Sequence, residues 1–203
     1  MVQRIDYFIT LNSPWTHLGA ARIEAIARRH DAALRVHPVD FRDIIFPSSG
    51  GLPVHKRSPQ RQAYRLQELR RWREHLGIPI VLKPRHAPFD EAFAAQCVIA
   101  ARETIGETPA VSLAHRILKA LWEEEANPAD RATLARLIGE VGLDPQTLME
   151  LAEEPRWATQ RRTDSRTALD RGVFGAPTYA IGVELFWGQD RLDFVERHLA
   201  RGG

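Results

Sequence analysis

The sequence predicts an α/β protein in which a long helical segment separates a β-α-β unit from a β-β-α unit. Short β-branched and aromatic runs, typical of strands, lie near the two ends of the 203-residue chain. Between them, helix start and stop signals recur at helical lengths. We therefore expect residues 1–45 and 172–203 to form one sheet-containing unit, with residues 58–171 as a helical insertion.

The N-terminal unit is predicted to be a β-α-β motif. Residues 5–10 are mostly β-branched or aromatic, which indicates a strand. Ser13 followed by Pro14 is a typical helix start, because serine caps a helix and proline is tolerated where no N–H is needed. Apolar residues at helical spacing continue to about residue 29, and residues 34–39 predict a second strand.

The central segment is predicted to be helical throughout. Ser58-Pro59 opens its first helix and Gly77 closes it. The later helices are expected to begin at Asp90, Thr108, Asp130, Asp144 and Pro155.

The C-terminal unit returns to strands. Residues 177–181 and 183–186 are strand-like, and Gly182 falls between them in a tight turn. A last helix follows, with Leu192, Val195 and Leu199 on one face.

Composition and charge exclude several classes of function. The 28 basic residues are interleaved with 26 acidic ones, whereas a nucleic-acid surface gathers basic residues without such compensation. There is no metal-ligand spacing and no phosphate-binding glycine loop, so we expect no metal site. No apolar run approaches the ~20 residues of a membrane span, and the N-terminus lacks a signal-peptide pattern. We expect a cytoplasmic protein with no membrane partner.

The cysteine count excludes a dithiol mechanism. Cys97 is the single cysteine, so the chain has neither a CxxC motif nor an intrachain disulfide. It lies in an apolar helical run, where a free cysteine is usually a small buried hydrophobe. A disulfide oxidoreductase is therefore not expected.

Three motifs carry a resemblance that covers essentially the whole chain. They are Asn12-Ser13-Pro14-Trp15, residues 172–178 (Gly-Val-Phe-Gly-Ala-Pro-Thr) and residues 185–192 (Leu-Phe-Trp-Gly-Gln-Asp-Arg-Leu). Together they resemble the 2-hydroxychromene-2-carboxylate isomerases and the kappa-class glutathione transferases. The resemblance implies a thioredoxin-like fold with a helical domain inserted in the middle, and glutathione as the cofactor.

The resemblance implies that Ser13 is the catalytic residue. A helix N-terminus favours negative charge, so a glutathione thiolate bound there is stabilised, with the Ser13 hydroxyl donating to its sulfur. Pro14 and Trp15 belong to the same cofactor-binding motif. The structural alternative for Ser13 is an ordinary helix cap, which stabilises a helix by ~1 kcal/mol.

The resemblance also implies the rest of the cofactor site. Pro177 is expected to follow a cis peptide bond that turns the Ala176 backbone toward the cysteinyl unit of glutathione. Gln189 and Asp190 are expected to hold its γ-glutamyl end. The alternatives are an ordinary turn proline and a helix cap.

The chain departs from the family pattern in one region. Residues 48–53 read Ser-Ser-Gly-Gly-Leu-Pro, without the asparagine that contacts glutathione in many relatives. A segment that often reads Pro-x-Asn is Pro84-Arg85-His86 here. These changes bear on the reaction more than on the predicted glutathione site.

The leading functional hypothesis is a glutathione-dependent isomerase of small aromatic metabolites, with Trp15 and Trp187 as candidate walls of the substrate pocket. The first alternative is a kappa-like glutathione transferase, which shares the fold and the site. The second is a non-catalytic glutathione- or peptide-binding module. Related proteins are often homodimers, and we expect a homodimer.

Overall fold

The protein folds around a mixed four-stranded sheet in the order β2-β1-β3-β4. The structure is a computed structural model that describes residues 3–201. Strand β1 (Arg4–Ile9) pairs in parallel with β2 (Ala33–Pro38) and antiparallel with β3 (Thr178–Ile181). Strand β4 (Glu184–Trp187) extends the sheet beyond β3. The predicted α/β fold is confirmed.

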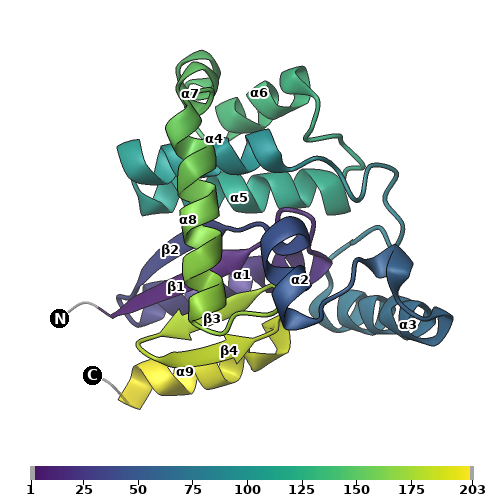
Figure 1. The fold of residues 1–203 in the computed structure, drawn as a ribbon. Helices are drawn as coiled ribbons and strands as arrows, with labels where there is room; N and C mark the ends of the chain where they lie inside the picture. The colour runs from purple at the N-terminus through teal and green to yellow at the C-terminus, as the bar shows by residue number, and fades with distance from the viewer. Residues whose placement is uncertain (1–2, 202–203) are drawn as a thin grey trace.

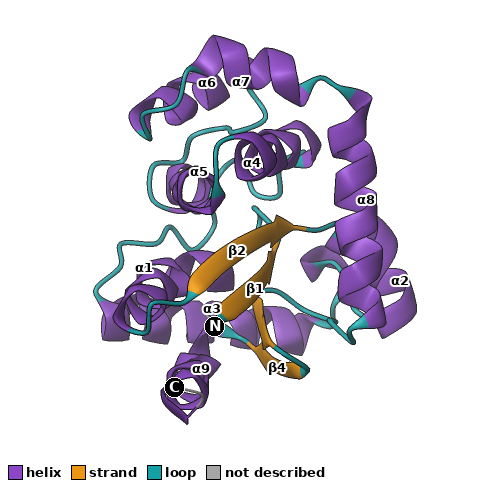
Figure 2. Cartoon of the chain, turned by 90° about the vertical axis from the view of Figure 1, so that its left-hand side faces the viewer, coloured by secondary structure: helices purple, strands orange, loops and turns teal. Residues whose placement is uncertain are grey.

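The helices cover both faces of the sheet and one of its edges (Figures 1 and 2). One face carries α1 (Pro14–Arg29) and α9 (Leu192–Arg201), and the other carries α2 (Phe46–Ser49) and α8 (Pro155–Asp170). The β2 edge is covered by α4 (Ala92–Thr104) and α5 (Glu107–Trp122), with α6 (Arg131–Glu140) and α7 (Pro145–Ala152) outermost. Helix α3 (Pro59–Leu76) projects to the side. None of the described helices has the length and apolarity needed to cross a membrane.

Most helix ends lie where the sequence predicts them, because side-chain caps form there. Ser13, Ser58, Asp130 and Asp144 each accept a hydrogen bond from the backbone three residues ahead. Two predictions miss by one or two residues. Helix α4 begins at Ala92 rather than at Asp90, although the Asp90 carboxylate accepts from the Ala92 amide at 3.1 Å, and α5 begins at Glu107 rather than at Thr108.

Residues 41–56 contain short helices that the sequence analysis did not predict. A π-helical turn (Phe41–Ile45) runs directly into α2, and a 3₁₀ turn (Val54–Lys56) follows. Phe41 and Ile45 are buried against α8-side residues such as Val173. Tertiary packing therefore fixes a segment that is too short to show a helical period.

The helical insertion shares its core with the sheet. Buried side chains of β1, β2, α1, α4 and α5 form one continuous hydrophobic cluster, including Tyr7, Val36, Ile23, Val98 and Ile117. Cys97 lies in this cluster, and burial raises the pKa of its thiol to about 12. The cysteine is therefore an inert core residue, as the sequence predicts.

The opposite face of the sheet carries a buried charge network. His37 of β2 lies between two carboxylates, with its Nε2 3.1 Å from Asp6 and its Nδ1 3.3 Å from Asp164. Arg102 of α4 contacts Asp164 at 2.8 Å and donates to the Val36 carbonyl at 2.8 Å. Arg171 contacts Asp6 at 2.7 Å. The network ties α4 and α8 to the two strands beneath them.

The network predicts an acid-sensitive contribution to stability. Burial raises the pKa of the Asp164 carboxyl, but the hydrogen bond from His37 and the charge of Arg102 outweigh it and bring the pKa to about 2. A carboxylate with a depressed pKa stabilises the fold above its unfolded pKa of about 4, and this stability is lost as the pH falls through its folded pKa. We expect about 2 kcal/mol of unfolding free energy to be lost between about pH 4 and pH 2 for this reason.

Asp164→Asn tests this contribution by urea unfolding at a series of pH values. The variant should be destabilised at pH 7 and should show a flatter decline between about pH 4 and pH 2. Asp193→Asn, at the exposed 3.6 Å pair with Arg197, is the control and should keep the wild-type slope. An unchanged slope in Asp164→Asn would contradict the assignment.

Candidate functional site

Ser13 caps α1 at the end of β1. Its amide donates to the Thr10 carbonyl at 3.1 Å, which forms the turn between strand and helix. Its Oγ accepts from the Thr16 amide at 3.2 Å. Pro14 follows at the first helical position, where a missing N–H is tolerated. Ser13 therefore does cap α1, as the structural alternative predicts. Its hydroxyl proton is not used by the cap and can be donated to another acceptor.

The Ala176–Pro177 peptide lies directly opposite Ser13. This bond is cis, as the resemblance implies. The Ser13 Oγ lies 3.4 Å from the Ala176 carbonyl oxygen, a long contact between residues 163 positions apart. Among residues 3–201 the Ala176 amide has no hydrogen-bond acceptor. The sheet thus brings the two predicted motifs together, and the Ala176 amide remains without an acceptor among the described residues.

Asn12 joins the Ser13 turn to the loop before α4. Its Oδ1 accepts from the Phe89 amide at 2.9 Å, and its Nδ2 donates to the Phe89 carbonyl at 3.1 Å. The same Nδ2 donates to Glu91 Oε2 at 3.1 Å. A single side chain therefore holds two segments that are far apart in sequence.

Glu91 is a nearly buried carboxylate beside the site. The Thr10 hydroxyl donates to Glu91 Oε2 at 2.6 Å, and Arg161 of α8 contacts Glu91 Oε1 at 2.8 Å. Burial raises the pKa of Glu91 above its usual value, although Arg161, Thr10 and Asn12 oppose the shift. The carboxylate is thus held by both the Ser13 turn and the insertion.

His17 lies one helical turn after Ser13 and faces α5. Its Nε2 lies 2.8 Å from Glu123 Oε1, while its Nδ1 is buried and has no partner among the described residues. Burial lowers the pKa of His17, and the attraction of Glu123 does not offset it. The imidazole is therefore neutral at neutral pH.

Of the two predicted residues ahead of α9, Gln189 is buried and Asp190 is exposed. Gln189 is 2% exposed, and Arg22 of α1 donates to its carbonyl at 3.0 Å and to its side-chain Oε1. Gly19 allows this packing, because a Cβ there would lie 2.9 Å from the Gln189 Cβ. The Asp190 carboxylate is exposed and contacts Arg191 at 3.0 Å. Of the two side chains, only that of Asp190 is accessible to a ligand. Both residues lie in a 3₁₀ turn ahead of α9 and not in the helix itself.

Trp187 and Phe174 form an exposed aromatic pair next to the cis peptide. Their ring centroids lie 4.7 Å apart, and the two residues are 52% and 46% exposed. Gly175 lets the indole lie against the backbone, because a Cβ there would be 2.2 Å from Trp187 Nε1. Trp15, by contrast, is half-buried and packs against the hydrophobic core. Trp187 is thus the more exposed of the two predicted aromatic walls.

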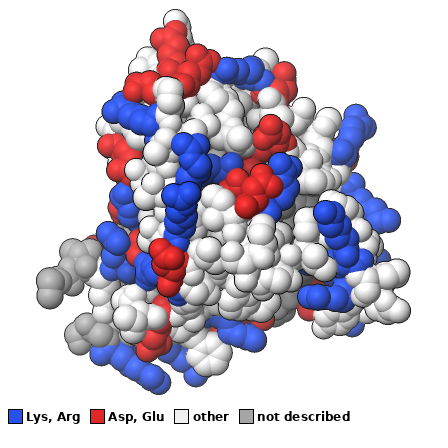
Figure 3. All heavy atoms as spheres, in the orientation of Figure 1, with Lys and Arg blue, Asp and Glu red and all other residues white. Residues whose placement is uncertain are grey.

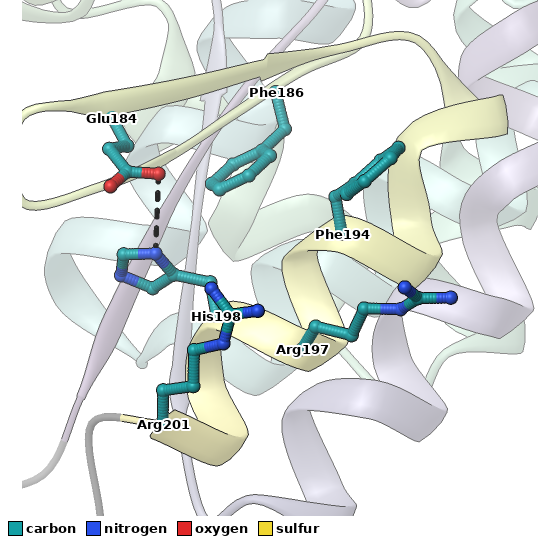
Figure 4. Close-up of a pocket in the computed structure, with 6 residues that line it drawn as sticks. All are labelled: Glu184, Phe186, Phe194, Arg197, His198 and Arg201. Carbon is teal, nitrogen blue, oxygen red and sulfur yellow. Dashed lines mark ion pairs between the residues drawn. The ribbon is translucent and has the colours of Figure 1, made fainter.

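A separate hollow of about 230 Å³ lies between β4 and α9 (Figure 4). Phe186 and Phe194 face it, and His198 lies 3.4 Å from Glu184. Arg197, on the same helix, pairs with Asp193. None of the predicted site residues lines this hollow.

Sequence reasoning missed four residues that support the Ser13 turn. Asn12 belongs to the Asn12-Ser13-Pro14-Trp15 motif, but the motif predicts no role for it, and no pattern in the sequence indicates the other three. They are Glu91, Glu123 and Arg161, which come from the insertion. Their contacts join residues 70 to 106 positions apart, and no local spacing signals such pairs.

The fold and the site define a thioredoxin-like protein without a redox dithiol. A family model described as a DSBA-like thioredoxin domain matches residues 4–200, and the chain belongs to this family.

Two relatives show which members of the family the chain resembles. The chain is 28% identical over 199 residues to the 2-hydroxychromene-2-carboxylate isomerase of Sphingobium xenophagum, covering 98% of this chain and 99% of that protein. It is 25% identical to the Pseudomonas putida enzyme of the same name, covering 97% and 94%. The resemblance to the 2-hydroxychromene-2-carboxylate isomerases, stated from the motifs, is confirmed.

Solved structures share the fold. A 2-hydroxychromene-2-carboxylate isomerase structure has a TM-score of 0.82 at 23% identity, covering 98% of this chain and 95% of that one. The cytosolic disulfide reductase DsbM from Pseudomonas aeruginosa with GSH has a TM-score of 0.66 at 22% identity, covering 97% and 99%.

Asn12→Ala should loosen the Ser13 turn. The change removes the three hydrogen bonds to Phe89 and Glu91, at about 1 kcal/mol each, so we expect a loss of about 2–3 kcal/mol in unfolding free energy. Urea unfolding measures it. Asn127→Ala is the control, because Asn127 accepts one bond from Ala129 in an exposed turn and should lose less than about 1 kcal/mol. Equal losses in the two variants would contradict the bridging role of Asn12.

Proposed function

We propose that the protein is a glutathione-dependent isomerase of small aromatic carboxylates, similar in reaction to the 2-hydroxychromene-2-carboxylate isomerases. The observation that carries the proposal is the placement of the Ser13 hydroxyl at the N-terminus of α1, 3.4 Å from the Ala176 carbonyl. Relatives of that name along nearly the whole chain support it. The DsbM structure with GSH supports the choice of thiol.

The described residues fit a bound glutathione. The Ser13 hydroxyl has only a long contact as a donor, and the Ala176 amide has no acceptor within residues 3–201. Pro14 and Trp15 begin the helix whose N-terminal dipole favours an anion. The exposed Asp190 carboxylate is available to an ammonium group. Gln189 contributes through its backbone position, because its side chain is bound to Arg22.

Glutathione bound here would supply a thiolate, the nucleophile for reversible addition to a substrate double bond; the bond is single while the sulfur is attached, and expulsion of the thiolate restores it. Ser13 holds the sulfur ionised by donating its hydroxyl proton as a hydrogen bond, and the α1 dipole stabilises the same charge. The Ala176 backbone would hold the cysteinyl unit by pairing with it as an added strand does. Trp187 and Phe174 offer apolar surface to the aromatic substrate.

A disulfide oxidoreductase is not supported, although disulfide enzymes share the fold. Such a reaction needs a reactive thiol on the chain, and Cys97 is buried with its pKa raised to about 12. The thiol of the proposed isomerisation therefore comes from a bound molecule and not from the chain.

Ser13→Ala tests the proposal. We expect saturable binding of reduced glutathione to the wild type by calorimetry, and isomerisation of 2-hydroxychromene-2-carboxylate that requires this thiol. The variant should raise the pKa of the bound thiol, read from thiolate ultraviolet absorbance, and should lower kcat by about 10²-fold or more.

The control is Asp144→Ala. Asp144 also caps a helix that begins with proline, and it accepts from Thr147 at 2.7 Å in α7, remote from α1. Both variants should lose about 1 kcal/mol of stability, but only Ser13→Ala should change the thiol pKa. An absence of glutathione binding at millimolar concentration would refute the proposal. Consumption of the thiol in a stable conjugate would instead identify a transferase.

A further inference from the structure

Strand β4 is the last strand of the sheet, and no strand pairs with its outer edge among residues 3–201. The Gly188 amide donates to the Pro177 carbonyl at 2.9 Å, which marks a hydrogen-bonded pair between β4 and β3. Hydrogen-bonded and non-hydrogen-bonded pairs alternate along an antiparallel ladder. The residues one and three positions before Gly188 are Trp187 and Leu185, so their N–H and C=O groups point away from β3.

The outer edge of β4 lacks most of the features that protect exposed strands. Natural sheets block such edges with lysine, proline or a bulge. Strand β4 reads Glu-Leu-Phe-Trp in an unbroken register with β3, and Val183 in the preceding turn is 98% exposed. Only its length of four residues limits pairing, because two outward residues supply few hydrogen bonds. A partner strand would therefore need side-chain contacts beside the edge as well.

Apolar side chains supply such contacts on both faces of β4. Trp187 packs against Phe174 on one face, and both are about half-exposed. On the other face Phe186 and Phe194 border the hollow of about 230 Å³ between β4 and α9 (Figure 4). Because side chains alternate along a strand, every second side chain of a strand added to β4 would point toward this hollow.

The charges around the hollow favour a second copy of the chain as the partner. Glu184 contacts His198 at 3.4 Å, and Asp193 contacts Arg197 at 3.6 Å, so both signs of charge are present. Basic and acidic side chains also lie together at the lower edge of Figure 3, where β4 and α9 lie in Figure 1. A twofold interface brings the same surface of two copies together, so a single sign would repel, whereas mixed signs can pair across it.

We propose that the outer edge of β4 is a dimer interface, at which β4 of a second copy adds in antiparallel orientation. A twofold axis at Phe186 pairs Leu185 with Trp187 of the partner subunit, and the reverse, so both outward residues of each strand are used. Phe186 then lies opposite Phe186 of the partner subunit, with Phe194 beside it. The homodimer expected from the sequence thus acquires a definite surface, and the inference does not depend on the proposed isomerase activity.

The mass of the full chain in solution, measured by light scattering, tests the interface. The wild type should have twice the 23.0 kDa of one chain. Phe194→Lys should raise the dimer dissociation constant by about tenfold or more, because it places a charge in the apolar contact. Leu185→Pro should have the same effect, because proline removes an outward N–H while pairing with β3 is retained. Tyr64→Lys replaces an exposed aromatic residue on α3 and should leave the dimer intact.

A disulfide across the twofold axis tests the register. In a non-hydrogen-bonded pair the two Cα atoms lie about 4.5 Å apart, within the range that a disulfide spans. Oxidised Phe186→Cys should therefore form a covalent dimer on a non-reducing gel. Glu184→Cys is the control, because its two copies would lie four residues apart along the strands, about 14 Å, and should not cross-link. The native Cys97 is buried and does not compete.

Three results would overturn the proposal. They are a monomeric wild type at about 50 μM, a dimer that persists unchanged in both Phe194→Lys and Leu185→Pro, and the absence of a cross-link in Phe186→Cys. Cooperative thermal unfolding identifies which variants are folded, and the cross-link decides even where Leu185→Pro is not. None of these measurements uses glutathione, so a failed interface leaves the proposed function standing, and a failure to bind glutathione leaves the interface standing.

Discussion

The pairing of β1 with β3 is the constraint on which the candidate site depends. Phe8 lies opposite Thr178 in the antiparallel register, near the end of β1. The chain then turns into α1 at Ser13, while the residues before Thr178 include the cis Ala176–Pro177 bond. A shift of one residue would reverse which side chains of β1 face the core, so the buried Ile5, Tyr7 and Ile9 fix the register. The contact between Ser13 and Ala176 follows from that register.

The helical insertion contributes polar groups as well as hydrophobic packing. Glu91, just before α4, accepts a hydrogen bond from Thr10 in the Ser13 turn, and Arg161 of α8 contacts Glu91 in turn. Glu123 reaches α1 from the end of α5. Because the insertion shares one core with the sheet, these groups are held by the same packing that holds β1.

Much of the fold could be predicted from the sequence, because local side-chain chemistry determines where helices and strands begin. Serine or aspartate caps followed by proline or a helical period placed α1, α3, α6 and α7 closely, and β-branched runs placed the strands. The motifs that contain Ser13 and Pro177 are also recognisable in the sequence, without knowledge of the contact between Ser13 and Ala176. What could not be predicted depends on distant partners: the hydrogen-bond partners of Asn12, the burial of Gln189 against Arg22, and the turn at Phe41–Ile45. These features arise from tertiary contacts that leave no periodic trace.

The burial of Cys97 has a consequence for how this protein meets oxidative stress. An enzyme that carries its own reactive thiol is inactivated when that sulfur is oxidised. Here the one sulfhydryl of the chain lies in the core between α4 and its neighbours, with 0% exposure, beyond the reach of peroxide or of a mixed disulfide. Under the proposed function the working sulfur belongs to a diffusible tripeptide, so oxidative damage would fall on a replaceable reagent and catalytic capacity would follow the reduced thiol pool of the cell.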